Sequence, residues 1–139
     1  MRPTVFDRFP KPACAELLGW DLLDFDVAKG WAKVGFQTRP EFLNASGFVQ
    51  GGLISAMLDD TMGPAVLIAS EGRFYVVTIG MQVQFLAPAR PGNFIGEGRV
   101  VQMGSSVAFV EANLRDSGAN LIATATSSAR LMPIEKLAA

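Results

Sequence analysis

The sequence contains no histidine, and this absence excludes more chemistry than any other feature of its composition. Histidine is the usual general base near neutral pH, the central member of serine and cysteine triads, and the commonest metal ligand. Cys14 is the only cysteine, so an internal disulfide and a cysteine cluster for a metal are also excluded. Any hydrolysis must therefore use carboxylates and backbone dipoles, and we expect neither a metal nor a separate cofactor.

Charged residues are also scarce, at 18% of the chain, and the formal net charge is −1. No stretch concentrates Lys and Arg, so we expect no nucleic-acid partner. Near the N-terminus, charges interrupt any apolar leader, and no charge-free apolar run reaches the length of a membrane span. We expect a soluble, cytoplasmic protein that does not bind membranes.

Apolar side chains, in contrast, make up half of the 139 residues, and the mean hydropathy is positive. The length fits one domain, which we predict to span residues 1–139. The hydropathy is high for a soluble monomer of this size. Part of the apolar surface is therefore expected to lie between subunits of a homo-oligomer, either a dimer or a pair of dimers.

Hydrophobic periodicity predicts one long helix with strands on both sides of it in the sequence. Residues 53–70 are apolar around most of a helical circumference. A strand over 77–85 alternates, so Val77, Ile79, Met81, Val83 and Phe85 are expected on one core face. The other expected elements are a short helix at 12–18 and strands at 22–27, 31–36, 93–102, 105–115 and 119–130. This order predicts an α+β fold in which a curved antiparallel sheet of about six strands wraps the helix.

Asp59 and Asp60 are the only charges between Glu41 and Glu71, and they lie within the long apolar helix. Helical spacing puts them in one arc with Ser55, Ala56 and Gly63. Burying an unpaired carboxylate is costly, so such a group is paired, neutralised or used. The two aspartates therefore either face solvent or an arginine at a subunit contact, or form a functional site.

Gly51 and Gly52 directly precede the predicted helix, after a loop over residues 40–50. They could form a flexible turn, or they could let a ligand approach the first-turn N–H groups, which have no partner within the helix and lie at its positive end. Such amides can hold a developing oxyanion. Asn44, in the same loop, could cap a turn or bind a water or a carbonyl.

The segment Asn44-Ala-Ser-Gly-Phe-Val-Gln50-Gly51-Gly52, with Asp59 nine positions after Gln50, resembles the signature of the phenylacetic-acid-degradation type of hotdog thioesterases. The similarity continues through residues 81–92 and 104–109 and covers about residues 42–132. The resemblance implies a hotdog fold. It departs at Gln50, where the family usually has histidine. Glutamine keeps a hydrogen-bonding side chain of similar reach.

Carried over to this sequence, the resemblance implies that Asp59 is the catalytic carboxylate, as general base or nucleophile. Gly51 would supply the N–H that polarises the thioester carbonyl, Asn44 would position water or the leaving thiolate, and Thr78 would help orient the water. In the family these groups meet across a dimer interface. Gln50, at the position of the usual histidine, completes this catalytic set. The further residues that we expect near the substrate are Gly52, Asp60, Arg90, Pro91, Gly92, Gly104, Ser105 and Ser106.

The sequence thus favours hydrolysis of an acyl-CoA thioester to a free acid and coenzyme A, with the coenzyme entering as part of the substrate. Two alternatives remain. A non-catalytic module could bind acyl-CoA in the same pocket, and the replacement at Gln50 leaves room for that reading. A hydratase or dehydratase of the same fold is less favoured, because those enzymes usually rely on a histidine.

Overall fold

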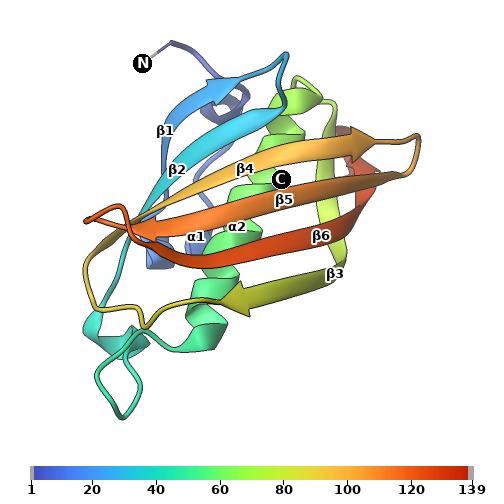
Figure 1. Ribbon diagram of the computed structural model, residues 1–139. Helices are drawn as coiled ribbons and strands as arrows, with labels where there is room; N and C mark the ends of the chain where they lie inside the picture. Colours follow the sequence, from blue (N-terminus) through green and yellow to red (C-terminus); the bar gives the residue numbers. More distant parts are fainter. Residues whose placement is uncertain (1, 138–139) are drawn as a thin grey trace.

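The computed structural model describes residues 2–137, in which one long helix lies across a six-stranded sheet (Figure 1). All strand pairs are antiparallel, and the strand order β1-β2-β4-β5-β6-β3 makes β1 and β3 the two edges. This confirms the predicted α+β architecture. The elements are η1 (Val5–Arg8), α1 (Ala13–Leu18), β1 (Asp21–Asp26), β2 (Trp31–Gln37), η2 (Pro40–Phe42), α2 (Gly51–Ala69), β3 (Phe74–Phe85), β4 (Asn93–Met103), β5 (Val107–Asp116), β6 (Leu121–Pro133) and η3 (Ile134–Lys136).

Helix α2 buries one side against the sheet and leaves the other side open. The buried side includes Ile54, Met57 and Leu58, each at most 1% exposed. The arc predicted from helical spacing is the open side, since Asp59 is exposed and the other members are only partly buried. The helix begins at Gly51 and not at residue 53, so the two glycines form its first turn instead of preceding it.

Two glycines of β4 let α2 approach the sheet closely. Thr61 is fully buried, and its hydroxyl donates to the carbonyl of Met57 at 2.7 Å, which satisfies it within the helix. A Cβ atom on Gly98 would lie 2.7 Å from the carbonyl oxygen of Thr61, and one on Gly96 would overlap the Thr61 side chain. Any larger residue at either position would push the helix away, so these glycines set the depth at which α2 sits.

Strand β3 differs from the expected pattern because it contains a bulge. Its pairing with β6 shifts between Thr78 and Gly80, so Ile79 is the extra residue. A bulge of this kind reverses which residues face the core. The predicted core face holds for Met81 and Val83, which pack against the core, and it is wrong for Val77 and Ile79, which are 52% and 63% exposed. Before the bulge, Thr78 is turned towards α2 instead.

The carbonyl of Asp60 finds a partner outside the helix. Pro64 has no N–H, so it cannot donate to this carbonyl, yet α2 continues past it to Ala69. The indole Nε1 of Trp20 donates to the Asp60 oxygen at 2.9 Å. Trp20, only 8% exposed, thereby holds the turn of α2 that carries the two aspartates.

By length and apolar composition alone, α2 could cross a membrane, a property shared by core helices of water-soluble proteins. Here the sheet wraps around it (Figure 1), and 44% of the apolar stretch is buried within the chain. The buried part of this apolar stretch is therefore explained by its packing against the sheet.

Candidate active site

The carboxylate of Asp59 lies exposed beside β3, near the middle of α2. Thr78 Oγ1 donates a hydrogen bond of 2.8 Å to Asp59 Oδ1. No cation pairs with this carboxylate, since the two ion pairs among residues 2–137 are Arg2 with Asp24 and Arg99 with Glu111. The structure thus brings two predicted site residues together and leaves the second carboxylate oxygen open to a ligand.

The N–H groups of Gly51 and Gly52 begin α2 and donate to no acceptor among the described residues. The next two amides, of Leu53 and Ile54, already bond the carbonyl of Gln50. Gly52 is exposed, and a Cβ atom on Gly51 would lie 3.4 Å from the ring of Phe85. Two unpaired donors therefore lie at the positive end of the helix, with the exposed ring of Phe85 beside them.

Phe85 was expected in the core and is instead 55% exposed beside Gly51. It shares the face of β3 towards α2 with Met81 and Val83, but β3 ends at this residue, so the ring lies exposed beside the first turn of the helix, which the alternating pattern alone does not indicate. We therefore add Phe85 to the candidate site.

Asn44 and Gln50 occupy the loop that leads into α2. The Asn44 Oδ1 atom accepts from the backbone N–H groups of Ser46 at 2.9 Å and Phe48 at 3.2 Å. This oxygen therefore shapes the loop, and the side-chain Nδ2 of Asn44, which has no partner among the described residues, is available to a ligand. Gln50 is exposed and its side chain makes no hydrogen bond among the described residues, while its backbone N–H donates to the Phe42 carbonyl.

Arg90, Pro91 and Gly92 are exposed and lie next to this loop. The backbone N–H of Val49 donates to the carbonyl of Ala89 at 2.8 Å, so the two segments run side by side. The guanidinium of Arg90 is 5.7 Å from the ring centroid of Phe48. A free positive charge is thus held near the N-terminus of α2, as a phosphate-binding role would require.

The turn at Gly104, Ser105 and Ser106 lies elsewhere. It is exposed and follows β4, whereas Arg90 precedes that strand. Eleven residues of β4 separate the two turns by roughly 33 Å. One chain therefore does not bring this turn to the loop before α2, and its predicted contact with the substrate would need a second copy.

Gly51 and Asp59 are also separated within one chain. They belong to the same helix, eight residues apart, which is about 12 Å along the axis. The Gly51 amide and the Asp59 carboxylate of one chain therefore cannot act on one carbonyl group. One chain therefore carries both halves of a site, but they lie too far apart to form one site together.

Asp60 points to a different environment from Asp59. It is partly buried, and its Oδ2 atom is fully buried with no hydrogen-bond partner among the described residues. Burial, together with the negative charge of Asp59, raises the pKa of the Asp60 carboxyl to about 7. Two adjacent aspartates thus have different surroundings, and only Asp59 is placed to meet a ligand.

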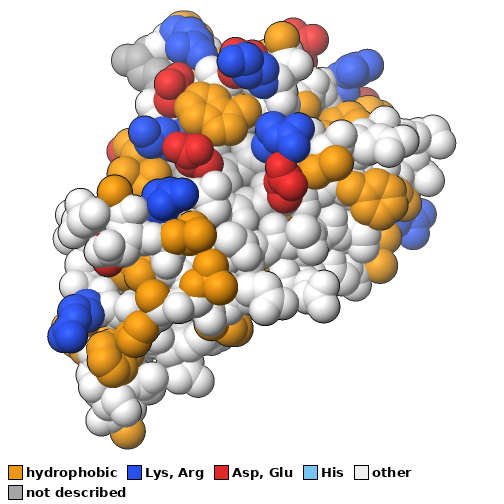
Figure 2. Space-filling view, viewed as in Figure 1, with side chains coloured by type: hydrophobic (Ala, Val, Ile, Leu, Met, Phe, Trp, Pro, Cys, Tyr) orange, Lys and Arg blue, Asp and Glu red, His pale blue; other side chains and the backbone are white. Residues whose placement is uncertain are grey.

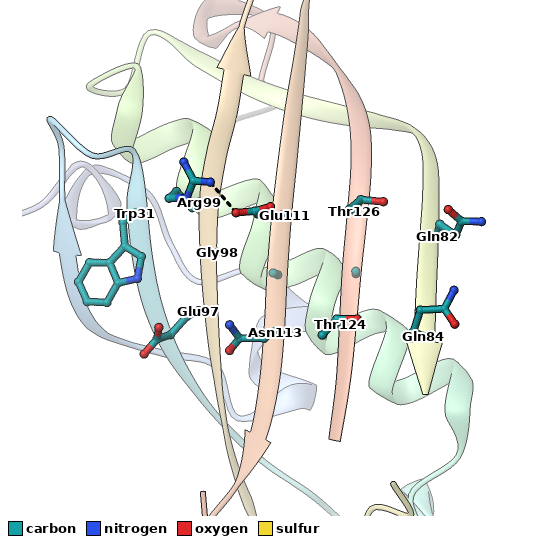
Figure 3. Close-up of a pocket in the computed structure, with 12 residues that line it drawn as sticks. Trp31, Gln82, Gln84, Glu97, Gly98, Arg99, Glu111, Asn113, Thr124 and Thr126 are labelled. Carbon is teal, nitrogen blue, oxygen red and sulfur yellow. Dashed lines mark hydrogen bonds and ion pairs between the residues drawn. The ribbon is translucent and has the colours of Figure 1, made fainter. Parts of the chain in front are cut away.

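The sheet face away from α2 carries a hollow of about 480 Å³. Side chains from five strands surround it and point away from the helix, among them Trp31, Gln82, Asn113 and the ion pair of Arg99 with Glu111 (Figure 3). Figure 2 shows that neither charged nor hydrophobic side chains cover most of the middle of this face. None of the predicted site residues lines this hollow.

Comparison with known proteins finds a matching family model and similar relatives. The family model described as "Thioesterase superfamily" matches residues 46–123, which include the end of the loop, α2 and β3 to β5. A protein of Saccharolobus solfataricus named "Putative esterase" is 33% identical over 108 residues, which are 78% of this chain and 76% of the relative.

Solved structures agree. A crystal structure from Ralstonia eutropha JMP134, named "a putative thioesterase, phenylacetic acid degradation-related protein", is 32% identical with a TM-score of 0.84, and the match covers 91% of this chain and 95% of that one. A Streptococcus mutans protein bound to acetyl CoA is 24% identical with a TM-score of 0.72, covering 82% and 89% of the chains. This second likeness concerns the fold alone.

Proposed function

This chain belongs to the thioesterase superfamily, and on that premise we propose that it hydrolyses acyl-CoA thioesters to a free acid and coenzyme A. Membership makes it an enzyme that acts on esters or thioesters, and its fold is the hotdog arrangement that the resemblance predicted. The observation that carries the proposal is the exposed Asp59 carboxylate, held by Thr78 and unpaired by any cation within residues 2–137.

In the proposed reaction, the carbonyl oxygen of the thioester accepts from the free amide of Gly51. Asp59 then removes a proton from water as the water oxygen bonds to the carbonyl carbon, or it attacks that carbon itself to give an anhydride that water cleaves. In both routes the carbon–sulfur bond breaks and the thiolate leaves as coenzyme A, taking its proton from protonated Asp59 in the first route and from the water that cleaves the anhydride in the second. No histidine is needed.

Two copies of the chain are required to complete such a site. Three contacts show that β3 runs antiparallel alongside α2, with Phe85 against Gly51, Thr78 on Asp59 and Val76 near Gly63. The free edge of β3 could pair antiparallel with β3 of a second copy. With the two-fold axis near Met81, Phe85 of the second copy would lie opposite Val77.

This register would bring the Gly51 amide of the second copy beside Thr78 and Asp59. It supports a homodimer with two active sites, each built from the carboxylate of one chain and the amides of the other. The exposed apolar side chains of Val77 and Ile79 at the same edge supply a reason to associate.

Acyl-CoA as the substrate class has separate support. The Streptococcus mutans structure carries acetyl CoA on the same fold. In this chain the exposed Arg90 lies close to the loop before α2, where a coenzyme A phosphate could meet it. The acyl group would extend past Gly51 and Phe85.

The test is release of free thiol from a panel of short, medium and aromatic acyl-CoAs. We expect Asp59→Asn to lower kcat/KM by about 10² to 10⁴, and Gly51→Pro to lower it by about 10² to 10³. Proline suits this position because it removes only the N–H in question, is favoured in the first turn of a helix, and follows Gln50 in an extended conformation.

Asp21→Asn, which neutralises an exposed aspartate on β1, is the matched control and should match the wild type. Binding of CoA without thiol release from any substrate would replace the proposal by a non-catalytic acyl-CoA module. An Asp59→Asn variant as active as the wild type would refute the role of Asp59.

A further inference from the structure

Asp60 presents a problem that the proposed reaction leaves unsolved. Its Oδ2 atom is fully buried without a hydrogen-bond donor among the described residues, directly next to the proposed catalytic residue. A buried ionised carboxylate normally has a cation or several N–H donors around it. Asp60 has neither, so ionisation of its carboxyl group is unfavourable in this environment.

Within one chain, the strands and the segment before β1 offer Asp60 no counter-charge. By strand register, the charged side chains of β1, β2, β4 and β6, and those of β5 before Asp116, lie on the sheet face away from α2, where Figure 3 shows Glu97, Arg99 and Glu111. Asp116 bonds its own turn, and β3 has no charged residue. The ammonium group of Lys11, on the segment before β1, donates a hydrogen bond to the Trp20 carbonyl.

The charge that does lie next to Asp60 is the negative charge of Asp59. Both burial and this neighbour disfavour ionisation, in agreement with the raised pKa of about 7. Trp20 also bonds the Asp60 carbonyl and so fixes the helical turn that carries both residues. The two aspartates are therefore held together as a pair whose members cannot both ionise without cost.

We infer that Asp60 serves the proposed reaction as the neutral partner of Asp59. Asp60 holds a proton in the active enzyme, and the enzyme loses activity when Asp60 ionises. The inference rests on the proposed function. Asp60 would not touch the substrate; it is a positioning residue that sets the charge of the site. Thioester cleavage builds negative charge on the carbonyl oxygen beside Asp59, and a second ionised carboxylate there would oppose it.

The direction with pH follows from this assignment. If the protonated form of Asp60 is the active one, kcat/KM should fall as the pH rises through about 7. Between about pH 6.5 and pH 8.5 the protonated fraction, and with it kcat/KM, should drop roughly 20-fold. Asp60→Asn cannot ionise, so its profile should lack this descending limb and exceed the wild type at pH 8.5.

Stability gives a readout that does not depend on catalysis. The folded protein keeps the Asp60 proton up to about pH 7, whereas the unfolded chain releases it near the ordinary value of 3.8. The contribution of Asp60 to the stability of the wild type should therefore fall as the pH rises from about 4 to 7, and level off above. The Tm of Asp60→Asn minus the Tm of the wild type should therefore increase by about 3 °C or more from pH 5 to pH 8.

The experiment measures both quantities for the wild type, Asp60→Asn and the control Glu71→Gln, which removes an exposed carboxylate just beyond α2. We expect the control to follow the wild type in both. A Tm gap for Asp60→Asn that does not change with pH overturns the inference, even if that variant is poorly active. Identical rate profiles overturn it too and leave the proposed function intact, whereas a wild type without thioesterase activity refutes both.

Discussion

The two edges of the sheet are treated in opposite ways. At β1, three aspartates lie along the strand, and the side chain of Arg2 bonds the Phe25 carbonyl and covers its ring at 3.9 Å. Charges and a covering segment are usual means of preventing strand-to-strand association. At β3, Val77 and Ile79 are exposed and nothing among residues 2–137 covers them. One edge is closed, and the other is equipped to pair.

The two edges also lie beside residues with different roles. The exposed edge carries Thr78 and lies beside Asp59, while the closed edge lies next to Trp20, which supports the helix from the other side. If this division is right, damage at β3 should abolish assembly and activity together, and damage near β1 should reduce stability.

The largest effect is expected from Ile79→Lys. A lysine on the free edge should block pairing with a second copy, giving a folded monomer with at least about 100-fold lower activity, because each site would lose one of its halves. Mass by light scattering and thiol release test this. The matched variant is Leu23→Lys, at an exposed position of β1, which should remain assembled and active. Equal behaviour of the two variants would contradict the comparison.

A smaller effect is expected from Thr78→Val, which keeps the shape of the side chain and removes its hydroxyl. Without the 2.8 Å hydrogen bond the Asp59 carboxylate loses its fixed orientation, and kcat/KM should fall about tenfold. The oligomeric state should not change. Full activity in this variant would mean that β3 contributes only the interface.

The smallest effect on activity is expected from Trp20→Phe, near the closed edge. It leaves the Asp60 carbonyl without its donor, because Pro64 cannot replace the indole. The cost should be about 1 to 3 kcal/mol in the free energy of unfolding, measured by urea denaturation. Activity at pH 6.5 should stay close to that of the wild type. A loss of activity larger than that of Thr78→Val would contradict the assignment of activity to the β3 edge and of stability to the β1 edge.

Much of this fold was predictable because its signals are local. The long apolar helix with one small and acidic arc, the alternating strands and the turn residues between them all depend on neighbours in the sequence. The open arc of α2 was therefore identified correctly, and α2 itself was misplaced by only two residues at its start.

The rest depends on contacts between distant residues. The bulge at Ile79 turns Val77 away from α2 and Thr78 towards it. Phe85 keeps the expected face but lies exposed at the end of β3, beside Gly51. The sequence predicts that Pro64 gives the Asp60 carbonyl no N–H donor, but it does not predict that Trp20, 40 residues before Asp60, supplies the donor instead. The different surroundings of Asp59 and Asp60 have the same origin, since burial is decided by packing.

The most direct test of the shared site is complementation between two inactive variants. Asp59→Asn and Gly51→Pro, co-expressed in equal amounts, should form mixed dimers in which one site of two has an intact carboxylate from one chain and an intact amide from the other. Since half of the dimers would be mixed, about a quarter of the wild-type activity should return. If mixed dimers form and activity stays at the level of the separate variants, Asp59 and Gly51 do not act together across two chains.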